Sequence, residues 1–510
     1  MKRKLNWYVM FVMLCTTLVF VSCSKDSDLV NEGKPFISSF ALKQGTNNFL
    51  TKDYYGEIKG DSLIVIQCPD LLCSDSIIPT FEGNYTSIQV NGEEQISGKS
   101  CQNFNNVVHY DIVGRDGNHV TYNVIIKVAN LVPKIDIYTK DNMSISSKDD
   151  YISATFIINN CPEFGQIEIK GKIKGRGNAT WGYPKKPYKI KFDNKLSLFG
   201  FPENKKWVLL AEACDRTLLR TAYMCEVSKA VGIDYTINYQ YVDLYINKEY
   251  MGTYLFTDQV EKSKNRVPVN DDGFLIELDG YYKNEPLYFT TDSLKYGFSF
   301  KYPDADDGEI LMNDDNYLFI TDFMNNMEKS LLMLSEDSTN TDYANYIDIE
   351  SFAKWFLAAE ITATYDPNRY FVLPSRNGKL KMIPLWDAEW SLGVWPTSAW
   401  GNPPEDMTKK VIWESKIYFY FLCKSPEFRK AIKKEWDLLK EKITVIKEQI
   451  EKNCELIHLS QRDNFIRWPN NNFQPLNVSF SSWEEEVEYI NQFFDERISF
   501  LESHINDIDF

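Results

Sequence analysis

The sequence predicts an α+β protein with a small N-terminal β-sandwich and a larger mixed domain whose C-terminal part is helical. Three observations support this prediction. Short strands separated by turn signals fill residues 35–130, strands and helices are mixed from about residue 135, and helical periodicity dominates beyond residue 315. A chain of 510 residues is also too long for one hydrophobic core, so two or more domains are expected.

The first element is a leader. A KRK start precedes an apolar run over residues 7–21, which stops at Ser22-Cys23 before a polar stretch. These features are typical of a secretory signal, and the run is shorter than the ~20 residues that cross a bilayer. The residues up to Cys23 look like a lipobox, so we predict a signal peptide over 1–22, acylation of Cys23 and a tether over 23–34. The alternative is an ordinary signal peptide with an incidental cysteine.

This leader predicts a protein of the bacterial cell envelope, held by lipid to a membrane, at the outer membrane or the cell surface. Two or more acyl chains hold a protein stably at a membrane, whereas one chain holds it marginally. The membrane is therefore one expected partner, reached through the anchor.

The second element is the sandwich over residues 35–130. Strands are predicted at 62–67, 108–113 and 120–128, and Asp116-Gly117 is a hairpin signal between the last two. The length and strand spacing fit an immunoglobulin-like β-sandwich. We interpret it as a spacer or a binding module.

The third element is the mixed domain, over residues 135–505. Alternating patterns predict strands at 167–175, 241–246 and 252–256. In the helical C-terminal part, apolar residues in steps of three and four predict one helix packed on the core. These residues are Trp436, Leu439, Ile443, Ile446 and Ile450.

Composition excludes several function classes. The formal net charge of -16 disfavours nucleic-acid binding, because an acidic protein repels a phosphate backbone. The four histidines lie at 109, 119, 458 and 504, so none falls between residues 120 and 457. Chemistry in that stretch therefore cannot use a Ser-His-Asp triad, a Cys-His pair or His-ligated zinc. Carboxylates, Lys, Arg and Asn remain as the candidate functional groups in that stretch.

A first polar cluster combines a glycine turn with a basic strand. The RGN sequence at 176–178 precedes a strand at 188–192, in which Lys189 and Lys191 share one face. Exposed backbone N–H groups beside cations suit the phosphates of a nucleotide. A solvated basic strand would show the same pattern.

A second cluster is predicted to be structural. The buried strand at 207–211 leads to Asp215 and Arg220. Asp215 is placed to cap a following helix, and Arg220 to pair with a carboxylate.

A third cluster carries the strongest chemical signal. Asp366-Pro367-Asn368 follows a helix-like stretch, and the proline forces a turn there. Asp387 and Glu389 follow the next short strand. Acidic groups at the ends of adjacent strands, with an Asn beside one, match the needs of phosphoryl transfer. One carboxylate orients the attacking hydroxyl, and another, with Asn, holds the metal.

In this order the three clusters resemble the CotH kinase family. The shared pattern comprises the RGN turn with a following Trp, the KKPYKIKF strand, the WVLLA and DRTLLR segments, a GTY hairpin and the WDAEWSLG strand. The resemblance covers roughly residues 135–505. It implies an atypical protein-kinase-like α+β domain that transfers phosphate from ATP to Ser/Thr hydroxyls of a protein, with Mg or Mn.

The resemblance also implies roles for individual residues. Glu389 stands where the family often has Asp. Asn368 lies only two residues after Asp366, which is closer than the kinase-like spacing. Carried over by motif, Asp366 is the catalytic carboxylate, Asp387, Asn368 and Glu389 are metal ligands, and Arg176, Asn178 and Lys189 contact the nucleotide.

Two other interpretations stay open. A catalytically silent relative would bind a glycan or protein at the cell surface. A glycoside hydrolase would use Asp366 with Asp387 or Glu389 as its acid/base pair, about 5 to 10 Å apart. The basic strand and the RGN turn have no role in that hydrolytic mechanism.

Overall fold

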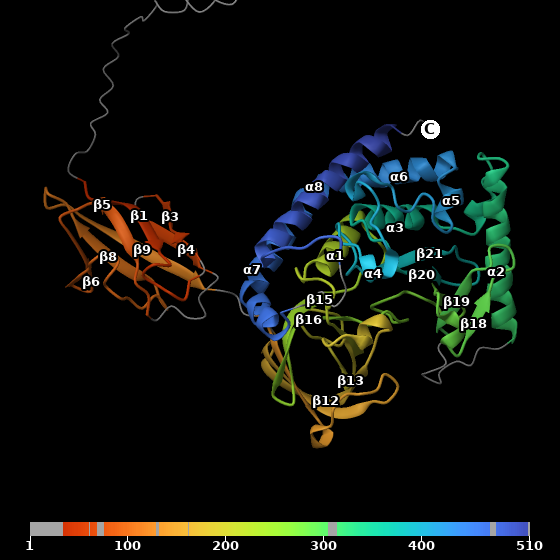
Figure 1. Cartoon of the computed structure of the whole chain (residues 1–510), viewed down its shortest axis with the longest axis horizontal. Coiled ribbons are helices and arrows are strands. Elements are labelled where there is room, and N and C mark those ends of the chain that lie inside the picture. The colour runs from red at the N-terminus through yellow and green to blue at the C-terminus, as the bar shows by residue number, and fades with distance from the viewer. Residues whose placement is uncertain are drawn as a thin grey trace, which may run out of the picture. The chain divides into compact units, whose positions relative to one another are not determined.

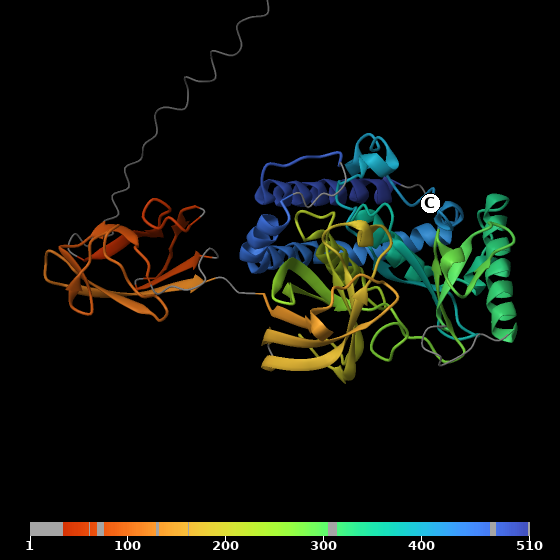
Figure 2. The same ribbon diagram turned by 60° about the horizontal axis from the view of Figure 1, so that its bottom comes forward.

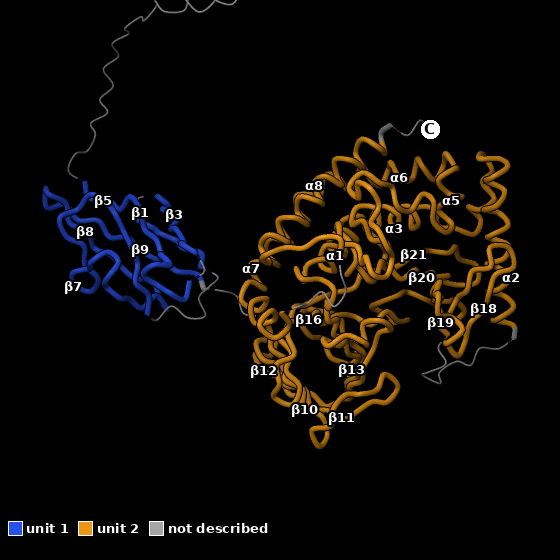
Figure 3. The backbone as a smooth tube through the Cα atoms, in the orientation of Figure 1, with its two compact units in different colours: residues 1–128 blue, residues 129–510 orange. Residues whose placement is uncertain are grey.

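The structure, a computed structural model, contains two compact units (Figures 1 and 3). Unit 1 is residues 1–128 and unit 2 is residues 129–510. The predicted signal peptide, with Cys23, and nearly all of the tether lie outside the described residues. Within the described ranges, no helix has both the length and the apolar character of a membrane span. These ranges are 34–50, 52–60, 62–68, 76–128, 132–161, 163–303, 314–469 and 476–507.

Unit 1 consists of two sheets around a shared core. Phe40 lies at its centre, with ring centroids 5.8 Å from Phe81 and 5.3 Å from Tyr110. The three-stranded sheet has the order β2 (Tyr54–Tyr55), β1 (Phe36–Leu42) and β5 (Thr80–Asn84). The six-stranded sheet has the order β3 (Glu57–Lys59), β4 (Leu63–Cys68), β9 (His119–Val128), β8 (Val108–Val113), β6 (Ser87–Val90) and β7 (Glu93–Glu94).

The predicted strands of unit 1 are present as β4, β8 and β9. The hairpin signal lies between β8 and β9, where Gly117 has φ +79° and supplies the left-handed backbone of the turn. β4 and β9 pair in parallel, although most neighbouring strands of this unit are antiparallel. The immunoglobulin-like assignment stays a prediction.

Unit 2 begins with a closed seven-stranded barrel (Figure 2). Its interior is apolar, with Trp207 and Phe256 stacked at 4.9 Å between ring centroids. The predicted strands at 167–175, 188–192, 241–246 and 252–256 all belong to it. The order is β10 (Lys134–Thr139), β11 (Ile152–Cys161), β12 (Gly165–Gly175), β13 (Tyr188–Leu196), β14 (Asn204–Leu210), β16 (Glu249–Asp258) and β15 (Tyr239–Ile246), which closes on β10.

A second sheet of unit 2 carries the third polar cluster. All of its strand pairs are antiparallel. Its order is β18 (Tyr288–Thr290), β19 (Gly297–Tyr302), β17 (Phe274–Leu278), β20 (Asn368–Leu373) and β21 (Lys381–Trp386).

Helices cover this second sheet and share its core (Figures 1 and 2). Helix α3 is central to that core, because its Trp355 lies 4.9 Å from the Trp413 ring and 5.7 Å from the Phe419 ring. The helices are α1 (Arg220–Val231), α2 (Asp314–Leu332), α3 (Ile349–Ile361), α4 (Thr397–Trp400), α5 (Phe419–Leu422), α6 (Pro426–Leu439), α7 (Ile443–Arg467) and α8 (Trp483–Asp507).

The prediction of one helix for the apolar stripe from Trp436 to Ile450 is wrong. Helix α6 ends at Leu439, a short 3-10 turn occupies Lys440–Lys442, and α7 begins at Ile443. Trp436 and Ile450 are nevertheless both buried. Apolar spacing cannot distinguish one helix from two consecutive helices whose buried faces stay in phase.

Candidate active site at the end of the β20–β21 hairpin

The hairpin brings two predicted acidic residues to the same end of a sheet. Asn368, the first residue of β20, lies opposite Trp386, the last residue of β21. Asp366, just before β20, and Asp387, just after β21, therefore flank the same edge. Pro367 separates Asp366 from the strand, and the side chain of Asp366 is 55% exposed.

Asp387 lies in an unusual backbone and electrostatic environment. Its φ of +71° places it in the left-handed region, which Asp tolerates better than most residues. Desolvation and the charge of Asp366 raise the pKa of Asp387 to about 6, although solvent reaches its side chain. Arg176 opposes this shift. The structure thus brings Asp366, Asp387 and Arg176 together from separate segments.

Arg176 reaches the site from the glycine turn. Its backbone N–H donates to the carbonyl of Pro187 at 3.2 Å, and its guanidinium lies 5.6 Å from the Trp386 ring. A Cβ on the preceding Gly175 would lie 2.3 Å from the Trp181 ring, so only glycine fits there. The turn therefore packs tightly and presents its arginine toward the end of β21.

The other two residues predicted to contact the nucleotide are Asn178, in the loop after β12, and Lys189, on β13. Asn178 is exposed and precedes a 3-10 turn without capping it. Lys189 lies on the outer face of β13, opposite Lys174 and Val208. Their nucleotide contacts stay predictions.

Asn368 is fixed by a buried acid. Its Nδ2 donates to the carboxylate of Glu277 on β17, and the other carboxylate oxygen of Glu277 lies 3.0 Å from Lys301 Nζ on β19. Burial raises the pKa of Glu277, and Lys301 opposes that shift. The sequence offered one signal for Glu277, an acid within the apolar FLIEL strand, but none for Lys301.

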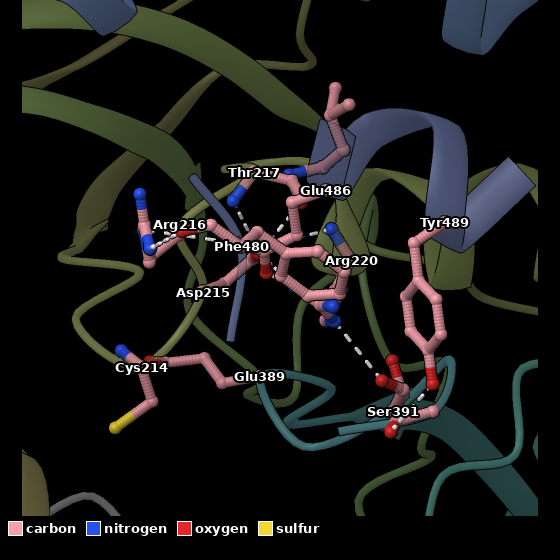
Figure 4. Close-up of polar contacts among 12 residues, drawn as sticks. Cys214, Asp215, Arg216, Thr217, Arg220, Glu389, Ser391, Phe480, Glu486 and Tyr489 are labelled. Atoms are coloured by element: carbon pink, nitrogen blue, oxygen red, sulfur yellow. Dashed lines mark hydrogen bonds and ion pairs between the residues drawn. The ribbon is translucent and has the colours of Figure 1, made fainter. Parts of the chain in front are cut away.

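Glu389 enters a buried charged cluster (Figure 4). Its Oε2 accepts the backbone N–H of Cys214 at 2.7 Å, and desolvation raises its pKa to about 7. Glu212 is buried and accepts the hydroxyl of Thr221 at 2.9 Å. Glu389 and Glu212 both act electrostatically on Lys185. The sequence alone did not indicate a role for Lys185, because its KKPY segment was interpreted only as a basic strand.

Lys185 is fully buried. Its Nζ donates to the carbonyl of Thr253 at 2.7 Å and lies 5.0 Å from the Tyr254 ring. Desolvation lowers the pKa of Lys185 to about 7, and Glu212 and Glu389 oppose this shift. The hydrogen bond between Cys214 and Glu389, and the charge of Glu389 acting on Lys185, link the end of the barrel to the segment that follows Asp387.

In the second cluster, Arg220 pairs with carboxylates, as predicted (Figure 4). Arg220 forms buried ion pairs with Asp215 and with Glu486 of α8. Asp215 Oδ2 also accepts the N–H of Arg220, the first residue of α1, at 2.8 Å, although Leu219 occupies the N-cap position. Arg220 Nε donates to the carbonyl of Ser391 at 3.0 Å. This network holds α1 and α8 against the loop that carries Glu389.

The donor set suits a hard divalent cation. Carboxylate and amide oxygens of Asp387 and Asn368 are the ligands that Mg²⁺ and Mn²⁺ prefer. Among the residues that the structure describes, no three acidic, His or Cys side chains surround one point. Mg²⁺ is usually held by one or two carboxylates together with substrate phosphates rather than by an all-protein cage.

Comparison with protein families gives a match over most of unit 2. The model of a family described as CotH kinase protein matches residues 173–501, which is more than half of the chain. None of the curated proteins compared with the chain matches it. The matched segment includes the glycine turn, the buried cluster and the β20–β21 hairpin.

Proposed function

The chain belongs to the CotH kinase protein family, and from this premise we propose that unit 2 is a metal-dependent kinase that transfers phosphate from ATP to Ser/Thr hydroxyls of a protein. The observation that supports the proposal best is the meeting of Asp366 and Asp387 at one end of the β20–β21 hairpin, with Arg176 beside them. Phosphoryl transfer requires a carboxylate that orients the acceptor hydroxyl, a carboxylate that binds the metal, and a positive charge near the phosphates.

Each residue has a distinct role in the proposed reaction. The acceptor hydroxyl oxygen bonds to the γ-phosphorus, the bond from that phosphorus to the β–γ bridging oxygen breaks, and ADP leaves. The exposed Asp366 orients the hydroxyl and takes its proton. Asp387 and Asn368 would hold Mg²⁺ or Mn²⁺, which neutralises charge on the phosphates. Arg176 adds a further positive charge.

We also propose that the protein works at the cell envelope. The sequence of the leader supports acylation of Cys23 after removal of residues 1–22. Unit 1 would then act as a spacer or binding module between the anchor and the kinase unit, and the acceptor would be a protein that reaches the same surface.

Calorimetric titration of ATP into the leaderless protein tests the nucleotide site. We expect binding that depends on Mg²⁺ or Mn²⁺ and disappears with a chelator. Absence of binding with both metals would contradict the proposal. It would favour instead a silent relative that binds a protein or glycan at the surface.

The raised pKa of Asp387 predicts a pH dependence of that binding. A carboxylate must be ionised to hold a metal, and the pKa of Asp387 is about 6 before metal binds. Below this pH the ionised fraction falls about tenfold for each pH unit, and metal-dependent affinity should fall with it. Titrations between pH 5 and 8, corrected for protonation of ATP, measure this. Constant affinity across that range would contradict the assigned role.

A further inference from the structure

The sheet face at the proposed metal site carries a buried acid that the proposed reaction does not use. Glu277 of β17 lies opposite Tyr370 of β20 and is 6% exposed. Because side chains alternate along a strand, Asn368 projects from the same face of β20 as Tyr370. Trp386 lies opposite Asn368, and Asp387 follows it directly. Glu277 therefore lies one strand further into the sheet than Asn368, on the face that presents it.

The carboxylate of Glu277 is divided between partners on the two neighbouring strands. One oxygen accepts the Nδ2 of Asn368, and the other lies 3.0 Å from Lys301 Nζ. Lys301 is the extra residue of a β-bulge in β19, because the register to β17 shifts there. Bulges re-aim side chains, and this one brings the ammonium group to Glu277. With both oxygens engaged, the carboxylate is held in one orientation.

These contacts determine which end of the Asn368 amide faces the proposed metal. A side-chain amide has a donating NH₂ group and an accepting oxygen, whereas an ionised carboxylate only accepts. Glu277 is paired with an ammonium group, so it takes the NH₂ group and the amide oxygen turns away from it. Hard divalent cations bind oxygen ligands. Glu277 thus presents to the metal the one side-chain atom of Asn368 that can bind it.

The stability of the sheet gives a weaker reason for this acid. Glu277 interrupts the FLIEL strand, whose four other side chains are apolar and belong to the core. Replacing a buried ion pair with apolar residues of similar volume is often neutral or stabilising. Removing a group that orients a metal ligand, in contrast, changes metal affinity roughly 10- to 100-fold. The contacts of Glu277 therefore fit a role in metal binding better than a purely structural one.

We propose that Glu277 is a positioning residue for the metal: it turns the oxygen of Asn368 toward the cation, and Lys301 holds Glu277 in the orientation that does so. The inference rests on the proposed metal-dependent kinase function and adds a residue outside the ligand set. Glu277 touches neither the metal nor ATP in this role. It acts through Asn368 alone, and this makes its effect separable from that of a charge.

Two substitutions of Glu277 separate positioning from charge. In Glu277→Gln, Lys301 takes the oxygen of the new amide, whose NH₂ group then faces Asn368 and reverses it. Glu277→Asp keeps the charge beside Lys301 but is one methylene too short to reach Asn368. Both variants should lower the affinity for Mn²⁺ about 10- to 100-fold, measured by calorimetry as the Mn²⁺ concentration that supports ATP binding. The Kd for ATP without metal should stay at the wild-type value.

A double-mutant cycle with Asn368→Ala tests whether Glu277 acts through the amide. Asn368→Ala should show a similar loss, and adding Glu277→Gln to it should cause no further loss of Mn²⁺ affinity. Glu277→Asp takes the place of Glu277→Gln in the cycle if the latter does not fold. Glu328→Gln is the matched control, because Glu328 is a buried acid of the same unit that accepts the hydroxyl of Tyr418 at 2.9 Å. It should keep the wild-type affinity for Mn²⁺.

Other results would overturn the proposal. Wild-type Mn²⁺ affinity in both Glu277 variants would do so, and a loss in Glu277→Gln that Glu277→Asp does not share would assign the effect to charge. Additive losses in the cycle would show that Glu277 does not act through Asn368. Because the readout is binding, a wild-type protein that binds ATP with Mn²⁺ but transfers no phosphate contradicts the kinase proposal and leaves this test intact. Binding of ATP without any metal dependence in the wild type would overturn both.

Discussion

Replacing Asp366 with Asn should stop phosphate transfer while leaving ATP binding intact. The amide keeps the shape of the side chain but cannot take the proton of the acceptor hydroxyl. A positioned general base contributes roughly 10²- to 10⁴-fold to a rate, so kcat should fall by about that factor. The Kd for ATP should change little, because the amide keeps the shape of the exposed side chain and Asp366 is not one of the proposed metal ligands.

This prediction needs both a rate and a binding constant. Asp193→Asn is a suitable control, because Asp193 is an exposed acid on barrel strand β13. It should leave both quantities at wild-type values. Wild-type turnover in Asp366→Asn would show that the role assigned to this carboxylate is wrong.

Replacing Asp387 with Asn should abolish metal-dependent binding of ATP. The change removes the negative charge that the site offers to a divalent cation, and we expect the affinity for ATP with Mg²⁺ to fall about 100-fold or more. Calorimetry with and without metal measures the loss. An unchanged metal dependence would contradict the assignment of Asp387 as a metal ligand.

The same variant should remain folded. The pKa of Asp387 in the protein, about 6, is higher than its ordinary value of 3.8. The folded state therefore binds this proton more tightly than the unfolded state, and ionisation between these pH values lowers stability. At pH 7 the neutral Asn avoids that penalty, so the Tm of Asp387→Asn should equal or exceed that of the wild type. A lower Tm would show that lost binding reflects damage to the fold.

The hairpins could be predicted from sequence because their information is local. Alternating apolar residues on both sides of Asp116-Gly117 determine β8 and β9 together with their pairing. The closure of the barrel could not be predicted in the same way. It depends on the parallel pairing of β10 with β15, in which Ile135 lies opposite Leu244. Nothing in either strand identifies a partner so distant in the chain.

The residues of the candidate site also differ in whether local sequence information could identify them. Asp366 and Asp387 could be paired from sequence, because they flank two consecutive strands that meet at one end. Lys301 and Lys185 could not, since each reaches its partner through the order of strands in the second sheet or in the barrel.

Transfer of labelled phosphate from γ-labelled ATP tests the central claim most directly. The leaderless protein would be incubated with Mg²⁺ or Mn²⁺ and a set of Ser/Thr peptides, beside the Asp366→Asn variant. The account predicts label on Ser or Thr in the wild type, lost in the variant and lost when the metal is chelated. Absence of transfer from bound ATP with either metal, on all acceptors, would contradict it.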